Sequence, residues 1–157
     1  KLLNQQFEKV RGLSKVNKLA EMINWQKQSM LTLVSEAKSR RQQQLQCFKL
    51  KIEAQPNSLC FGDETLLEIA FANMLENAAR YGNGTASMQC IETDSEYRIV
   101  LTNPFANKHE ASQDEGVGLG SVICDVVAKC HQGRFELTLN EQTKQATAIL
   151  TWSNSRG

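Results

Sequence analysis

The beginning of the chain carries hydrophobic side chains at every third or fourth position, with polar residues between them. This spacing predicts an amphipathic helix over residues 1–22. The hydrophobic positions are Leu2, Leu3, Phe7, Val10, Leu13, Val16 and Leu19. No partner stripe lies nearby in the sequence, so this helix is expected to pack on a second copy or on a helix outside this sequence. Packing against its own domain is the alternative.

The pattern then changes twice before residue 60. Residues 23–28 predict a short strand, and a three- and four-residue spacing from Met30 to Ala37 predicts a helix that ends in the polar run Arg40–Gln44. Alternation of hydrophobic and polar residues from Phe48 to Glu53 predicts a half-buried strand. A turn is expected to follow at Pro56.

A second amphipathic helix follows. Thr65-Leu-Leu-Glu68 matches a capping box that would start this helix, and Asp63 is the rival cap. Two separate rows of side chains run along it, about 120° apart at roughly 100° per residue. The row expected to face the core is Leu67, Phe71, Met74 and Ala78, and the row expected to face a ligand is Asn73, Asn77 and Arg80.

The rest of the chain alternates between strand and helix patterns. The strand segments are Ala86–Glu92, Tyr97–Thr102, Phe135–Leu139 and Ala146–Trp152, of which the last three are expected at the centre of a sheet. Ser121–His131 predicts a helix ended by Gly133. These elements predict an α/β two-layer sandwich, with a mixed sheet of about five strands covered on one face by about three helices.

Charge and length narrow the function classes. The chain has 157 residues, with 18 Lys and Arg against 17 Asp and Glu. Because these charges nearly cancel, no overall field favours a nucleic-acid partner. No hydrophobic run approaches the roughly 20 residues needed to cross a bilayer, and the first residues lack a signal-peptide pattern.

The five cysteines are scattered and include no C-x-x-C pair. They are Cys47, Cys60, Cys90, Cys124 and Cys130. Reduced thiols in the core of a cytosolic protein are therefore expected, in preference to disulfides or a zinc site.

The asparagine row suits metal and phosphate chemistry. Magnesium prefers hard oxygen ligands and keeps several waters, so one side-chain oxygen suffices when phosphates supply the rest. Asn77 is the candidate ligand, and Asn73 lies one turn earlier, where it can orient a metal-bound water or a phosphate oxygen. Arg80 can neutralise phosphate charge, and Tyr81 can stack on the base or the ribose. The alternative is that all four are ordinary surface residues of a capped helix.

A glycine-rich segment downstream suits phosphate binding. Gly116, Gly118 and Gly120 would let backbone amides approach oxygens, and a helix beginning near Ser121 would offer its positive end to a phosphate. A purely structural strand-to-helix turn is the alternative. The order and spacing of the two motifs favour a nucleotide site.

The two motifs together resemble a known family. Asn73-Met-Leu-Glu-Asn77-Ala-Ala-Arg80-Tyr81 is similar to the N box, and Gly116-Val-Gly118-Leu-Gly120 to the G2 box, of the ATP-binding catalytic domain of sensor histidine kinases. That domain belongs to a wider group with gyrase, MutL and heat-shock ATPases. The resemblance runs from about Trp25 to Trp152 and includes Gly62-Asp63 before the N-box helix.

The resemblance implies roles for these residues. Asn77 would be the Mg²⁺ ligand, Asn73 and Arg80 would contact phosphates, and Tyr81 would border the nucleoside. The G2 residues Gly116, Val117, Gly118, Leu119 and Gly120 would close on the triphosphate. Residues 1–22 would be the second helix of the dimerisation and phosphoacceptor hairpin, and residues 23–157 the ATP-binding catalytic domain.

The chain departs from the family where the base should bind. In place of an Asp-x-Gly-x-Gly box it has Asn103-Pro104-Phe105-Ala106-Asn107. The family's Asp accepts a hydrogen bond from the adenine amino group. Asn103 can accept one through its amide oxygen without the extra strength of a charge, so weaker nucleotide binding is expected. Pro104 and Phe105 are also bulky where a ligand needs room.

Two further departures concern the lid and the histidines. The segment Asn107–Glu115, which would form the ATP lid, is short and polar, so its closure is expected to depend on a partner. His109 falls in this segment, and His131 ends the G2 helix, where the helix dipole favours a cation. Neither lies where the phosphoacceptor should be, so the acceptor histidine is expected upstream, outside this sequence.

The resemblance therefore implies a protein-histidine kinase domain that binds Mg²⁺ and ATP. It would donate the γ-phosphate to a histidine outside this sequence, for relay to the receiver domain of a response regulator. A homodimer formed through the N-terminal helix is implied, as is a cytoplasmic location within an inner-membrane sensor.

Two alternatives keep the same fold. One is a degenerate, non-catalytic regulatory or docking module, favoured by the Asn103-Pro104-Phe105 segment. The other is a serine kinase that acts as an anti-sigma factor, which would not need the first helix.

Overall fold

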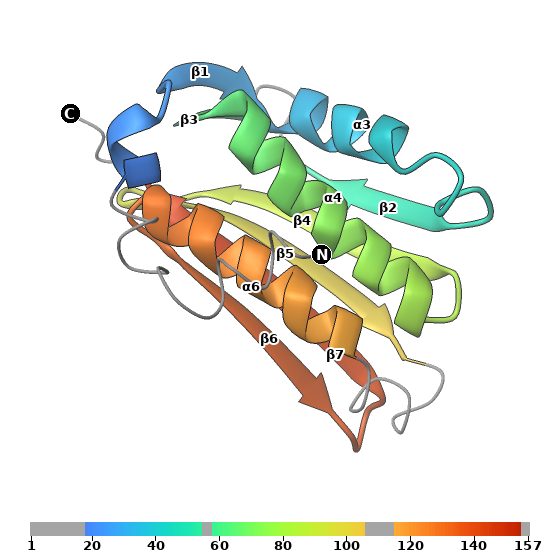
Figure 1. Ribbon diagram of the computed structural model, residues 1–157. Helices are drawn as coiled ribbons and strands as arrows, with labels where there is room; N and C mark the ends of the chain where they lie inside the picture. Colours follow the sequence, from blue (N-terminus) through green and yellow to red (C-terminus); the bar gives the residue numbers. More distant parts are fainter. Residues whose placement is uncertain (1–17, 55–57, 106–114, 155–157) are drawn as a thin grey trace.

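A mixed sheet forms one layer of the molecule and helices form the other (Figure 1). The computed structural model describes residues 18–54, 58–105 and 115–154, with the backbone alone for residues 115–120. The five strands in spatial order are β2 (Lys49–Glu53), β4 (Thr85–Glu92), β5 (Glu96–Pro104), β7 (Gln145–Ser153) and β6 (Arg134–Asn140). β2 and β4 run parallel and the other neighbours antiparallel, so the predicted α/β sandwich with a mixed five-stranded sheet is confirmed.

The helices α3 (Met30–Arg40), α4 (Glu64–Tyr81) and α6 (Glu115–Cys130) cover one face of this sheet. Figure 1 shows α4 crossing the middle of that face, with α3 on one side of it and α6 on the other. A separate two-stranded antiparallel sheet joins β1 (Gln26–Ser29) to β3 (Leu59–Gly62), at the end where α4 begins.

The predicted position of the Phe135 strand was wrong. β6 forms one edge of the sheet and pairs with β7, whereas β5 and β7 are interior. Its inward-facing Leu137 and Leu139 stay 39% and 38% exposed, as expected for an edge. Periodicity finds a strand but says nothing of its neighbours, because pairing depends on distant parts of the chain.

Helix α4 starts two residues earlier than the capping box suggested, because its cap is Asp63 and not Thr65. Asp63 is the cap: its Oδ1 accepts a hydrogen bond from the Leu66 N–H at 3.0 Å. Its Oδ2 accepts one from the Asn24 N–H, also at 3.0 Å, which ties the N-terminal segment to the helix. Asp63 therefore displaces Thr65 from this role. The predicted inward row is confirmed, because Leu67, Phe71, Met74 and Ala78 are all buried.

Helix α3 agrees with its predicted pattern. The Ser29 side chain accepts a hydrogen bond from the Thr32 N–H and caps the helix. The side chains predicted to face the core (Met30, Leu33, Val34 and Ala37) are buried. β1 begins at Gln26, three residues later than predicted.

The core lies between the two layers and centres on Trp152. Its ring is fully buried beside Phe71 and Tyr97, and its Nε1 donates a 3.0 Å hydrogen bond to the Phe61 carbonyl oxygen. Four cysteines are buried free thiols, as predicted, and burial raises the pKa of Cys60 to about 12 and that of Cys90 to about 11. Cys47 is exposed, so the expectation of a core thiol was wrong there.

Helix α6 differs from prediction at both ends. It begins at Glu115, so the glycine-rich segment forms its first turns and does not precede it as a loop. At the other end Gln132 takes the left-handed conformation with φ 61°, and the Gly133 N–H donates to the Ala128 carbonyl oxygen at 2.7 Å. This is the hydrogen-bond pattern of a Schellman ending, with a glutamine where glycine is usual.

The predicted helix over residues 1–22 is described only from residue 18, and residues 18–22 are helical. Its hydrophobic positions from Leu2 to Val16 lie outside the described residues, as do residues 107–114 of the predicted lid and His109. Within the described ranges no helix combines the length and hydrophobicity that crossing a membrane requires.

Candidate functional site

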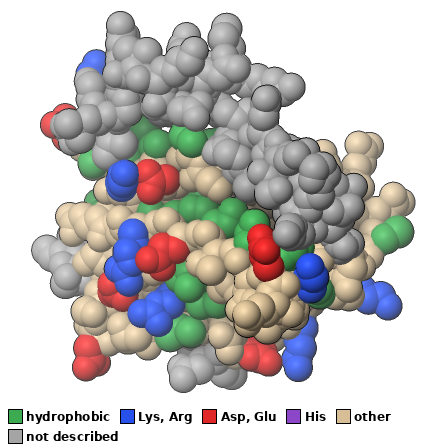
Figure 2. Space-filling view, turned by 90° about the horizontal axis from the view of Figure 1, so that it is seen from below, with side chains coloured by type: hydrophobic (Ala, Val, Ile, Leu, Met, Phe, Trp, Pro, Cys, Tyr) green, Lys and Arg blue, Asp and Glu red, His purple; other side chains and the backbone are tan. Residues whose placement is uncertain are grey.

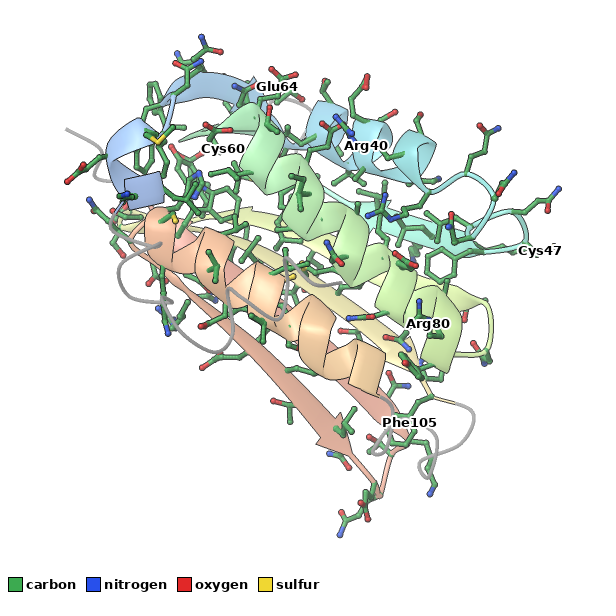
Figure 3. All side chains as sticks on the ribbon, viewed as in Figure 1. Arg40, Cys47, Cys60, Glu64, Arg80 and Phe105 are labelled. Carbon is green, nitrogen blue, oxygen red and sulfur yellow. The ribbon has the colours of Figure 1, made fainter. Side chains whose placement is uncertain are left out.

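A small cavity lies between the last turns of α4 and the sheet, near the end of β5. Its volume is about 50 Å³, and Asn77 and Tyr81 of α4, Asn103 of β5 and Phe105 line it. Figure 3 shows Phe105 at this end of the molecule, close to the end of α4 that carries Arg80. Asn77 and Tyr81 from one predicted motif and Asn103 from another thus meet at one place.

Asn77 sits on the wall of this cavity with its side chain half-buried. Its side chain makes no hydrogen bond within the described part of the chain, so its amide oxygen is available to a ligand. This is the donor type that Mg²⁺ accepts beside phosphates and water. The position fits the predicted role of a single protein ligand for the metal.

Asn103 forms the floor of the same cavity and is 6% exposed. Its Nδ2 donates a 3.0 Å hydrogen bond to the Pro104 carbonyl oxygen, which fixes the orientation of the amide. The side-chain nitrogen also packs on Gly82, where an added Cβ would lie 2.8 Å from it. The donor end of this amide is therefore used within the protein, and its oxygen is the atom that can accept a hydrogen bond from a base.

Asn73 and Arg80 are not among the residues that line the cavity. The Asn73 Nδ2 donates to the Ile69 carbonyl oxygen at 2.9 Å, so this end of the amide is used within α4. Arg80 pairs with Glu76 at 3.2 Å, and its guanidinium lies 5.7 Å from the centre of the Tyr81 ring. Both residues follow the same side of α4 as Asn77, but their side chains are held by neighbours on the helix.

Glu76 is shared between two arginines. Besides its pair with Arg80, Glu76 forms an ion pair with Arg41, which follows α3; the Arg41 Nε lies 2.9 Å from the Glu76 Oε1. A single carboxylate is therefore shared by two cations beside the asparagine row, and the three groups together keep a net charge of +1. The Glu76–Arg80 pair has the i,i+4 spacing of helix neighbours, whereas the Arg41 contact could not be found from local spacing because Arg41 lies outside α4.

The structure describes only the backbone of the glycine-rich segment. Residues 116–120 are helical within α6, and the side chains of Val117 and Leu119 are outside the description. Their predicted contact with a triphosphate stays a prediction.

Sequence reasoning missed most of the apolar cavity wall. The missed side chains come from the sheet: Leu101, Phe135, Leu137, Leu139, Ala146 and Ala148. Strand alternation could have found them, since alternate residues of one strand share a face. Leu137 and Leu139 are partly exposed. Figure 2, which views the molecule from below Figure 1, shows hydrophobic side chains among charged ones on that surface.

His131 lies outside the site and is not the helix-end cation predicted. It is fully buried, its Nε2 accepts a hydrogen bond from the Asp63 N–H at 3.0 Å, and its Nδ1 lies 2.8 Å from the Val127 carbonyl oxygen. Only a neutral ring protonated at Nδ1 can satisfy both contacts. Burial accordingly lowers the pKa of His131.

Several solved structures of histidine kinases are similar to this chain in fold. No protein-family model matches the chain. A histidine kinase from Burkholderia phymatum STM815 aligns with a TM-score of 0.73 at 13% identity, over 96% of this chain and 83% of that one. The catalytic domain of histidine kinase ThkA aligns with a TM-score of 0.67 at 12% identity, over 83% and 97%. The chain has the fold of a histidine kinase catalytic domain.

A third structure is that of full-length ShkA in complex with AMPPNP. It aligns with a TM-score of 0.69 at 14% identity, over 98% of this chain and 37% of that protein. The present chain spans about a third of the length of ShkA, and the catalytic domain of ThkA covers 83% of the present chain. At these identities the likeness concerns the fold, and the chemistry of the site depends on the residues described above.

Proposed function

We propose that this chain is the ATP-binding kinase domain of a sensor histidine kinase. Asn77 of α4 and Asn103 of β5 line one cavity, and this observation carries the proposal. One amide can supply an oxygen to Mg²⁺ while the other accepts a hydrogen bond from the adenine amino group. The complex of ShkA, a protein with the same fold, with AMPPNP supports a nucleotide as the ligand.

The chain's own residues would act by positioning. Phosphoryl transfer needs in-line approach and charge neutralisation more than covalent help from the protein. Asn77 would hold the metal, Asn73 would orient a metal-bound water or a phosphate oxygen through its Oδ1, and Arg80 would approach the phosphates after leaving Glu76. Tyr81 would border the nucleoside, and the backbone amides of residues 116–120 would meet the triphosphate.

The phosphate acceptor and the partners belong to the same proposal. A histidine outside this sequence would receive the γ-phosphate, and the receiver domain of a response regulator would take it from there. Residues 1–22 would form the end of the dimerisation hairpin, and residues 23–157 the catalytic domain of a sensor at the inner membrane.

Calorimetry tests the proposal directly. Mg²⁺-ATP and Mg²⁺-ADP are titrated into the chain, into Asn77→Ala and into Asn24→Ala, an exposed asparagine whose truncation removes the same atoms away from the cavity. Saturable binding that persists in Asn24→Ala and disappears in Asn77→Ala supports the kinase. Equal binding by all three proteins would remove Asn77 from the metal site.

The second candidate is a non-catalytic docking module of the same fold. The small volume of the cavity and the burial of Phe105 beside Asn103 favour it. Absence of nucleotide binding by the unmutated chain and by every variant, with circular dichroism intact, would select this function.

Removing residues 1–22 distinguishes the histidine kinase and the docking module from a serine kinase that acts as an anti-sigma factor. That enzyme should keep its partner without the first helix, whereas a histidine kinase should lose dimerisation.

A further inference from the structure

Phe105 fills space beside the two asparagines that the proposed function assigns to nucleotide. Its side chain is 3% exposed, and it lines the same cavity as Asn77 and Asn103. The remaining cavity volume of about 50 Å³ is far below the roughly 300–1,000 Å³ typical of small-molecule sites. A nucleobase cannot enter while the ring is in this position.

The backbone at Phe105 is held on both sides. Its N–H donates to the Lys144 carbonyl oxygen at 3.0 Å, and the residue forms an isolated antiparallel bridge with Gly82 at the end of α4. Adding a Cβ to Gly82 would bring it 3.0 Å from the Pro104 carbonyl oxygen, so this contact is close. The main chain is therefore fixed, and the ring is the part that can move by changing its rotamer.

The ring packs in a minor cluster. Phe105 and Ala146 form a hydrophobic cluster of their own, separate from the main cluster around Trp152. Ala146 offers only a methyl group to this contact. Because Phe105 is not a member of the main cluster, rotation of its ring would break no contact within that cluster.

Among the described residues that line the cavity, no other large side chain combines these properties. Phe135 packs against the main cluster. Met74 and Leu101 belong to the main core, and Leu139 at the rim is 38% exposed. Tyr81 is buried, but its ring lies beneath the Arg80 guanidinium and is carried by a helix. Phe105 is thus the residue whose movement would create the missing volume.

We propose that Phe105 occupies the nucleobase position in the absence of nucleotide and sets the nucleotide affinity of this site. The proposal rests on the proposed function, because it assigns the same cavity to the base. Binding then requires the ring to leave, and the apparent Kd equals the intrinsic Kd divided by the fraction of molecules in which the cavity is open. An open fraction of about one tenth raises the apparent Kd about tenfold.

Truncation of Phe105 tests the affinity. Mg²⁺-ATP is titrated calorimetrically into the full chain, into Phe105→Ala and into Leu59→Ala, which shortens an exposed apolar side chain of β3 that is not among the residues lining the cavity. We expect the Kd of Phe105→Ala to fall by about tenfold or more and that of Leu59→Ala to change less than about twofold.

The outcomes separate the two proposals. Binding by the unmutated chain that Phe105→Ala leaves equal or weakens, with the circular dichroism spectrum retained, overturns the role of Phe105 and leaves the kinase proposal standing. Binding that appears only in Phe105→Ala supports both proposals. Absence of binding in all three folded proteins overturns both.

Fluorine NMR observes the ring itself and needs no affinity change. The chain has six phenylalanines, so incorporation of 4-fluorophenylalanine gives few signals, and the Phe105 signal is the one lost in Phe105→Leu. Saturating Mg²⁺-ATP should shift this signal and make it sensitive to a paramagnetic agent in solvent. A Phe105 signal that stays buried at saturation would contradict the displacement.

Discussion

The imidazole of His131 accepts a hydrogen bond from the backbone N–H of Asp63, a residue 68 positions earlier, at 3.0 Å. The bond joins the end of α6 to the residue that caps α4, and the Trp25 ring packs edge-on against the imidazole at 5.2 Å between centroids. Protonation of Nε2 would place an N–H against an N–H, so this junction requires a neutral histidine.

Stability should therefore fall on mild acidification. Burial lowers the pKa of His131 in the folded state below its usual 6.5, so the unfolded chain binds the proton more tightly. The stabilisation is complete above pH 6.5 and is lost as the pH falls from there toward the folded-state pKa. The free energy of unfolding in urea should decrease between pH 7 and 5.5 with a slope of at most about 1.4 kcal/mol per pH unit for one proton.

The only other histidine in the sequence supplies the control for that slope. His131→Gln should remove the slope although it lowers stability throughout, and His109→Ala should retain it. If the slope survived in His131→Gln and vanished in His109→Ala, the pH dependence would come from His109 and not from His131.

Replacing Asn103 by the family's aspartate should not improve the site. The Asn103 Nδ2 donates to the Pro104 carbonyl oxygen, and a carboxylate oxygen in its place would face that carbonyl without a proton. We expect Asn103→Asp to lower the free energy of unfolding by about 1–3 kcal/mol and to leave ATP affinity no tighter. Urea unfolding and calorimetry measure the two effects. Tighter binding at unchanged stability would mean that the amide is not held in this orientation.

Glu76 should weaken phosphate binding by neutralising Arg80. Glu76→Gln removes the negative charge from the ion pairs with Arg41 and Arg80 and increases the positive charge near Asn77. We expect the Kd for Mg²⁺-ATP to fall by a few-fold, more at low salt than at high salt, with a stability change within about 1 kcal/mol.

Glu96 offers a matched comparison because it also pairs with two arginines, Arg98 and Arg134, at the opposite end of β5 from Asn103. Glu96→Gln should leave nucleotide affinity unchanged. Equal effects of both substitutions on Kd would show that only the net charge of the protein matters.

Gly133 should tolerate no side chain, because of space and not because of backbone conformation. An added Cβ would overlap the Thr151 carbonyl oxygen and lie 2.6 Å from the Trp152 Cα, and backbone atoms of β7 cannot move aside easily. Gly133→Ala should lower the free energy of unfolding by more than about 3 kcal/mol. Urea denaturation followed by circular dichroism measures this.

Gly84 is the contrasting case. It has φ of +95°, and an added Cβ would meet its nearest neighbour at 3.9 Å. Gly84→Ala should cost about 1 kcal/mol, from strain alone. If Gly133→Ala lowered the free energy of unfolding no more than Gly84→Ala, then Gly133 would not lie as close to β7 as described.

Local signals in the sequence were sufficient for the elements and for part of the site. The three- and four-residue spacing from Leu67 to Ala78 identified the buried row of α4, and the separate row placed Asn77 toward the cavity. These conclusions succeed because both rows lie on one rigid helix, where spacing determines direction.

Properties that depend on distant residues could not be predicted in this way. The edge position of β6, the pairing of Glu76 with Arg41, and the neutral state of His131 each depend on a contact with another element. The choice between Thr65 and Asp63 as the cap of α4 could not be made from local sequence either. Asp63 is stabilised partly by a hydrogen bond from the N–H of Asn24, 39 residues earlier.

The helical start of α6 gives the two ends of this helix different resistance to opening. Gly116, Gly118 and Gly120 lie in its first turns, and each glycine costs roughly 1 kcal/mol in a helix interior relative to alanine. The far end, in contrast, is closed by Gln132 and Gly133 against Lys129 and Ala128. Amide hydrogens in the glycine-rich turns should therefore exchange with solvent deuterium well before those around Val127, and α6 would unwind from the end that the proposed function assigns to the triphosphate.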